Sequence, residues 1–152
     1  MAAGDVFVFD QFMVDVQEKI HDLETDTIKV ALITSAVTPA VTDADPRWGA
    51  GGTTNFSTSQ VTPGGNYTTG GSAAATPSVT LSGGAAVFDA GDISIAQHAS
   101  NPTNARWGII YNDTAAGKNC IGYVDLGTTI DLSAGAFSIT WNASGITSMN
   151  QA

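Results

Sequence analysis

Residues 105–126 read ARWGIIYNDTAAGKNCIGYVDL and carry the clearest β pattern in the chain. The segment 105–112 is rich in aromatic and β-branched residues, and the segment 120–126 is similar in composition. Residues 113–119 between them are polar and include a glycine, which suits a hairpin connection. The stretch therefore predicts two paired antiparallel strands.

Short strands of the same kind are expected on both sides of this hairpin. The strand-like segments are residues 27–34, 78–82, 86–89, 92–95, 128–132 and 136–141, and turns that contain glycine separate several of them. In the first segment Ile28, Val30 and Leu32 fall on one face. Because Ala31 and Ile33 make the other face apolar as well, we expect this strand to be buried on much of both faces. Many short strands with glycine turns are typical of a β-sandwich or barrel.

The first 24 residues have the pattern of a helix instead. Their apolar side chains recur at steps of three and four residues, the spacing of one helix face: Phe9, Phe12, Met13, Val16, Ile20 and Leu23. Such a helix is marginal alone in water, so its apolar stripe must pack on something. The domain's own sheet is one possible partner. A neighbouring subunit is the other, and in that case Phe12, Val16 and Ile20 are the candidate contacts.

Residues 36–77 form a long excursion rich in glycine and proline. Its four prolines and its glycine pairs exclude a single regular element, so we expect short extended pieces near residues 55–61 and 67–69. Long loops of this kind are usually functional, and Arg47, Trp48 and Tyr67 are its candidate contacts. The two aromatic residues either anchor the loop on the domain or contact a neighbour.

Together these segments predict one domain over residues 1–152, because a chain of this length is not comfortably long enough for two. The fold class is mainly β: an antiparallel β-sandwich or barrel with one N-terminal amphipathic α-helix and a long Gly/Pro-rich loop excursion. The expected parts are the helix in 1–24, a first strand in 25–35, the excursion in 36–77, a β core in 78–146 and a tail in 147–152.

Composition excludes several kinds of partner. Only 12% of the residues are charged, and 14 acidic against 5 basic residues give a net charge of −9. Such a chain lacks the Lys/Arg surface that nucleic-acid phosphates require. It has no run of 18 apolar residues to span a bilayer, and its N-terminus lacks the basic region of a secretory signal. We therefore expect no nucleic-acid partner, no membrane partner, and synthesis in the cytoplasm.

No catalytic constellation is recognisable in the sequence. His21 and His98 are far apart, and no nucleophile-elbow or phosphate-loop motif occurs. Asp43 and Asp45 could bind a divalent cation weakly, but they lack the rest of a calcium loop. The single cysteine, Cys120, fits a small buried strand residue. We expect a non-enzymatic protein with no catalytic, cofactor-binding or metal-ligating residues. Its 19 Thr, 12 Ser and 17 Gly suit a repetitive structural assembly.

Several segments also follow one another in a distinctive order. After the amphipathic residues 9–23 come DTIKVALITS at 26–35, NYTTGG at 66–71, AVFDAGDISI at 86–95, the hairpin up to residue 127, and GAFSITWNASGI at 135–146. In this order, over nearly the whole chain, they resemble a group of small virion structural proteins of tailed bacteriophages. Each motif is weak alone, and the ordered set is moderately specific.

The resemblance implies a capsid decoration, or cement, protein. Such a protein is made in the bacterial host cytoplasm, binds the major capsid protein on the outer surface of the virion head, and stabilises contacts between capsid subunits. It also implies self-association as a dimer or trimer. No catalytic residue is implied.

Two alternative functions stay open. A tail or fibre-associated structural protein would use the same kind of β domain. A carbohydrate-binding β module would need an aromatic stacking platform, for which Trp48, Trp107 and Trp141 are the candidates. The last two fall inside strand patterns, which favours a place in the core.

Overall fold

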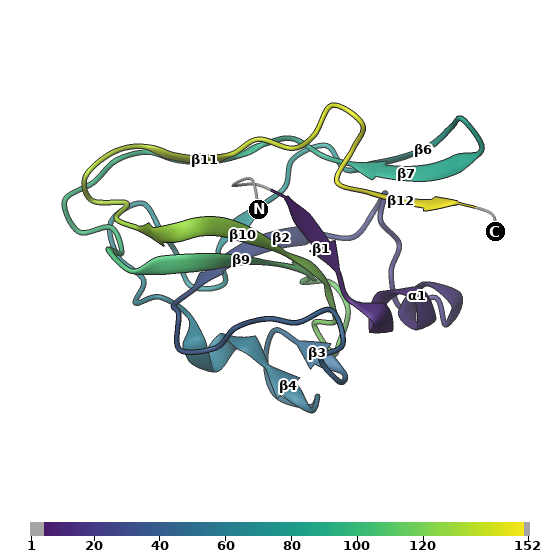
Figure 1. Ribbon diagram of the computed structural model, residues 1–152, viewed down its shortest axis with the longest axis horizontal. Helices are drawn as coiled ribbons and strands as arrows, with labels where there is room; N and C mark the ends of the chain where they lie inside the picture. The colour runs from purple at the N-terminus through teal and green to yellow at the C-terminus, as the bar shows by residue number, and fades with distance from the viewer. Residues whose placement is uncertain (1–4, 151–152) are drawn as a thin grey trace.

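The computed structural model describes residues 5–150, and its central element is a five-stranded antiparallel sheet (Figure 1). The strand order is β1-β10-β9-β2-β5, with the bounds Val6–Val8, Cys120–Ile130, Ala105–Asn112, Ile28–Ile33 and Ser72–Ala73. Strands β9 and β10 are the predicted hairpin, with Tyr111 opposite Cys120 and Trp107 opposite Asp125. Strand β2 pairs with β9 over all six of its residues. The hairpin therefore lies at the centre of the sheet.

Both faces of this sheet are covered. Above it in Figure 1 lie β8 (Ile93–Ile95) and β11 (Phe137–Ile139), which pair with each other and share one hydrophobic cluster with the sheet: Val30, Ile110, Val124, Ile93, Ile95 and Ile139. Below it lies the first part of the excursion, whose Trp48 and Phe56 share a second hydrophobic cluster with Ala31, Ile109 and Tyr111 of the sheet. This arrangement confirms the expected burial of the first strand on both faces. Among residues 5–150 the layers form no closed barrel, so the mainly β fold is sandwich-like.

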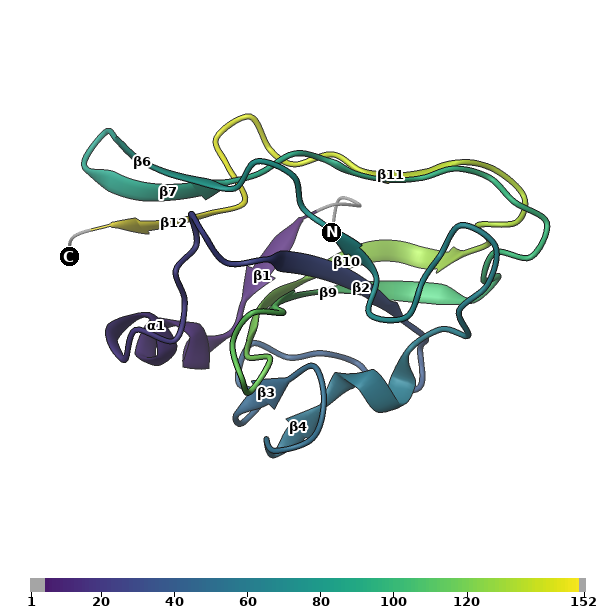
Figure 2. The same ribbon diagram turned by 180° about the vertical axis from the view of Figure 1, so that it is seen from behind.

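A second sheet of three strands projects from this body, and we call it the arm. Its order is β12-β7-β6, with the bounds Thr147–Asn150, Ala85–Asp89 and Ser78–Ser82. In both views it extends over α1 (Asp10–Gln17) at one end of the molecule (Figures 1 and 2). Gly83 and Gly84, with φ of 57° and 86°, form the two-residue turn between β6 and β7. Positive φ at both positions is the conformation that favours glycine in such hairpins.

The N-terminal helix is shorter than predicted. Residues 6–8 form β1 at the edge of the central sheet, and α1 ends at Gln17, so Ile20 and Leu23 lie outside it. Lys19 adopts φ of 61°, and the N–H groups of Lys19 and Ile20 donate to the carbonyls of Val16 and Asp15. This is the Schellman pattern that terminates helices. Periodicity alone could not reveal it, because the apolar spacing continues past the turn. Residues 1–4 of the expected helix lie outside the described residues.

Two other segments also differ from expectation. Within the excursion the structure forms β3 (Pro46–Arg47), β4 (Thr54–Asn55) and the 3-10 helix Phe56–Ser59, where an extended piece was expected at 55–61. The Asn55 side chain accepts a hydrogen bond from the Ser57 N–H, which caps this turn. Strands β3 and β4 are parallel, unlike the other strand pairs of the described residues. In the expected tail, residues 147–150 form β12 on β7, and residues 151–152 lie outside the described part.

Candidate interaction surface

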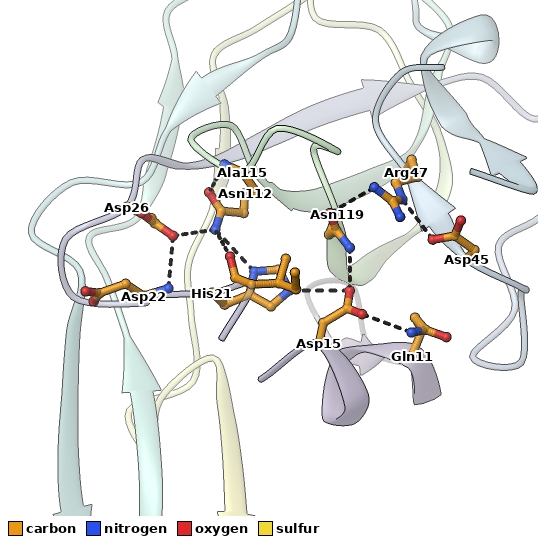
Figure 3. Close-up of polar contacts among 11 residues, drawn as sticks. Gln11, Asp15, His21, Asp22, Asp26, Asp45, Arg47, Asn112, Ala115 and Asn119 are labelled. Atoms are coloured by element: carbon orange, nitrogen blue, oxygen red, sulfur yellow. Dashed lines mark hydrogen bonds and ion pairs between the residues drawn. The ribbon is translucent and has the colours of Figure 1, made fainter. Parts of the chain in front are cut away.

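A buried polar network fixes α1 against the body (Figure 3). Asp15 on α1 is only 3% exposed, and its carboxylate accepts hydrogen bonds from Gln11 Nε2 at 2.9 Å and from Asn119 Nδ2 at 2.7 Å. Asn119 Oδ1 accepts from Arg47 Nη1 at 3.2 Å, and Arg47 Nε donates to Asp45 at 2.8 Å. The network therefore joins the helix, the β9–β10 connection and the excursion. Buried polar groups of this kind require their partners, so the three segments are held in one arrangement.

His21 extends this network from the loop after α1. Its side chain is fully buried, with Nε2 3.8 Å from Asp15 Oδ2 and Nδ1 3.2 Å from Asn112 Nδ2. Two backbone N–H groups donate to Asn112 Oδ1. The side-chain nitrogen of Asn112 therefore faces the His21 ring, and it also donates to Asp26 Oδ2 at 2.6 Å. We infer from these neighbours that Nδ1 accepts and Nε2 carries the proton. Burial lowers the pKa of His21 although Asp15 and Asp26 act to raise it, so the neutral ring suits this site.

Three of the six candidate contact residues belong to the core. Phe12, Trp48 and Tyr67 are 1%, 5% and 2% exposed. Trp48 stacks on Tyr111 with ring centroids 5.2 Å apart. Tyr67 Oη accepts a hydrogen bond from the Leu32 N–H at 2.8 Å, and burial raises the pKa of Tyr67 to about 12. In this structure the two aromatic residues of the excursion therefore anchor it on the domain, which is one of the two alternatives that the sequence left open.

The other three candidate residues are partly exposed but do not form one surface. Val16 packs beside the core from α1, and Ile20 lies in the turn after it. Arg47 directs its guanidinium to Asn119 and Asp45, as described above. The structure therefore does not bring the six together into one site.

The tryptophans do not form an exposed stacking platform. Trp48, Trp107 and Trp141 are 5%, 8% and 7% exposed. The Arg106 guanidinium lies 3.9 Å from the ring centroid of Trp107, and Trp141 Nε1 donates to the Gly91 carbonyl at 3.0 Å. These rings stabilise the domain, and a bound sugar would need a ring face that is open to solvent.

The large apolar side chains that are exposed lie on α1 and on the arm. Met13 and Val14 on α1 are 53% and 46% exposed, Leu81 on β6 is 82% exposed, and Met149 on β12 is 38% exposed. A groove of about 440 Å³ runs between α1 and β12, and Met13 and Met149 both line it. A second hollow beside it is lined by Val79 and Met149. We use the name arm surface for these exposed side chains together with Val79, that is, for Val79, Leu81 and Met149 on the arm and Met13 and Val14 on the neighbouring α1.

The arm is also free of charge over most of its length. Residues 78–88 and 142–150 contain no Asp, Glu, Lys or Arg, in a chain whose net charge is −9. A partner can therefore approach the arm without desolvating an ion or meeting a like charge. The alternation of Val79 and Leu81 in a neutral segment was visible in the sequence. Strand β12 was missed because four residues near the end of the chain carry little β pattern of their own.

Comparison with protein-family models, with curated proteins and with solved structures finds no match to this chain. Among residues 5–150, no three His, Cys, Asp or Glu side chains are grouped so that they could hold a metal ion. Cys120 is buried, as its place in a strand predicted. None of the helices in the described part of the chain is both long and apolar enough to cross a membrane.

Proposed function

We propose that this protein is a non-enzymatic structural protein that binds other subunits through the arm surface. The observation that carries the proposal is a set of exposed apolar side chains on α1 and on the largely uncharged arm, next to a body whose central sheet is covered on both faces. Contiguous exposed apolar side chains mark contact sites on proteins. The body supplies a fixed base, because buried hydrogen bonds hold α1 in place beside the groove.

More specifically, we propose a capsid decoration protein of a tailed bacteriophage, which binds the major capsid protein on the outside of the head. The ordered sequence motifs support this proposal through their resemblance to small virion proteins. The acidity supports an outer position, since packed DNA would repel a chain of charge −9. A protein bound across several subunits adds contacts that expansion of the head must break, and many copies need only modest affinity each.

A tail or fibre-associated structural protein is the second candidate, because the same arm surface could bind a different virion subunit. The carbohydrate-binding module has less support, since its three candidate tryptophans are buried.

Cryo-microscopy of virions that carry this protein tests the proposal. We expect density for this fold to repeat with icosahedral symmetry on the outside of the head, with the arm surface at the contact. Density confined to the tail would support the second candidate. Absence of the protein from purified virions, checked by mass spectrometry, would contradict both.

A matched pair of variants tests the surface itself. Met149→Asp places a charge in the groove and should reduce occupancy on particles at least tenfold. Ser138→Asp, at an exposed position on β11 away from the arm, should leave occupancy unchanged. Equal occupancy of the two variants would rule out the groove as the contact.

A further inference from the structure

Strand β6 is an exposed edge strand of the arm. It pairs only with β7 in the described structure and forms the outer strand of the arm in both views (Figures 1 and 2). Its five residues, SVTLS, include no charged residue and no proline, and its register with β7 runs without a bulge from Ser78 opposite Asp89 to Ser82 opposite Ala85. Proteins commonly protect exposed edges with lysine, proline, bulges or covering segments. An edge without these features is suited to pairing with another strand.

The turn determines which backbone groups face outward. In a hairpin with a two-residue turn, the residues that flank the turn form a hydrogen-bonded pair, here Ser82 and Ala85. Hydrogen-bonded and non-hydrogen-bonded positions then alternate along the strand. Thr80 therefore directs its N–H and C=O toward β7, whereas Val79 and Leu81 direct theirs toward the free edge.

We propose that β6 pairs antiparallel with β6 of a second copy of this chain, about a two-fold axis at Thr80. This register places Leu81 of each copy opposite Val79 of the other, so the outward-facing backbone groups of both residues are satisfied. Thr80 lies opposite Thr80 of the second copy at a non-hydrogen-bonded position. The two arms become one six-stranded sheet through an isologous contact.

Two observations favour a second copy over another partner. Leu81 is 82% exposed, and this register gives it an apolar cross-strand neighbour, Val79 of the other copy. Two copies with a charge of −9 each repel one another, and β6 and the turn at Gly83 and Gly84, which carry no charge, are where they can approach closely. Main-chain hydrogen bonds then supply affinity, as in other strand-addition contacts.

The proposal goes beyond the proposed function by adding a contact between copies of this chain, and it does not depend on the virion assignment. Its test uses the full chain in solution and no virion, so it can fail while the virion assignment stands. Because five residues per copy form a small contact, we expect a dimer that dissociates on dilution. Sedimentation and native mass spectrometry over a concentration series should show a monomer–dimer equilibrium.

Cysteine crosslinking tests the register. Thr80 and Ser148 are both exposed and lie in one cross-strand row, each opposite Val87, on the two outer strands of the arm. Thr80→Cys should form a disulfide-linked dimer under mild oxidation, because its non-hydrogen-bonded position brings the two Cβ atoms close. Ser148→Cys is the matched control and should form at least tenfold less.

Charged substitutions on the surface provide a second test of the proposal. Leu81→Lys should weaken dimerisation at least tenfold, whereas Met13→Lys, at another exposed apolar position, on α1, should leave it unchanged. Any of three results would overturn the proposal: a monomer at all concentrations up to about 1 mM, a trimer, or preferential crosslinking through Ser148→Cys.

Discussion

The body and the arm of this protein are built from the same kind of strands but differ in what covers them. In the body, β2 and β9 have apolar side chains on both faces, and layers on either side cover them. In the arm, β6 and β12 are mostly exposed and uncharged, with Leu81 82% open to solvent. The body therefore makes the larger contribution to stability, and the exposed strands of the arm are available for binding. Substitutions in the two regions should affect different measurements.

The largest effect on stability is expected from truncation of the body core. Ile110 is 1% exposed in the cluster above the central sheet, so Ile110→Ala should lower the free energy of unfolding by about 2–5 kcal/mol. The matched change in the arm, Leu81→Ala, should alter it by no more than about 0.5 kcal/mol. Urea denaturation of both variants measures the difference. Equal destabilisation would show that the arm contributes to the core as the body does.

The polar network should give the next largest effect. Asn112 is fully buried, and Asn112→Ala removes its bonds to Asp26, to the His21 ring and to two backbone N–H groups. Unsatisfied buried groups of this kind should cost about 1–3 kcal/mol in the same denaturation experiment. Asn142→Ala, which removes a bond to the Ser144 N–H at an exposed site beside the arm, should cost about 0.5 kcal/mol or less. A harmless Asn112→Ala would mean that these hydrogen bonds do not stabilise the segment after α1.

A smaller effect is expected from pH. The folded state lowers the pKa of His21 through burial, so the unfolded chain binds this proton more readily. Stability should therefore be fully present above pH 6.5, decrease as the pH falls through the unfolded-state pKa near 6.5, and level off below the folded-state pKa. His21→Gln should flatten this dependence between pH 7 and 5. A slope that persists in the variant would assign the dependence to another group.

The smallest effect on stability belongs to the exposed end of the arm. Leu81→Ser should leave the denaturation midpoint nearly unchanged, within about 0.5 kcal/mol, because the side chain makes few contacts in the monomer. The same variant should weaken association between copies, which sedimentation measures. A variant that unfolds more easily yet associates normally would reverse the roles assigned to body and arm.

The body was largely predictable from the sequence, and the binding surface was not. The segment 105–126 contains both the propensity and the polar connection of its hairpin, and β2 shows its double burial in its composition. The end of α1 depends on the left-handed conformation of Lys19, which no apolar spacing encodes. Trp48 and Tyr67 were candidate contacts because large aromatics in loops fit both roles, and only the fold brings them to Tyr111 and Leu32.

The arm surface required the tertiary structure for a further reason. Met13 and Met149 are 136 positions apart, and their groove exists only because β12 pairs with β7 above α1. Local propensity contains no information about such a juxtaposition.

Amide hydrogen exchange of the full-length protein at low and high concentration tests the division between body and arm. At high concentration the amides of Val79 and Leu81 should exchange more slowly than in dilute solution, because they become paired with a second copy. The amides of β9 and β10 should be equally protected at both concentrations, since they are bonded within the body. Exchange at Val79 and Leu81 that does not depend on concentration, or concentration-dependent protection confined to the body, would contradict this account.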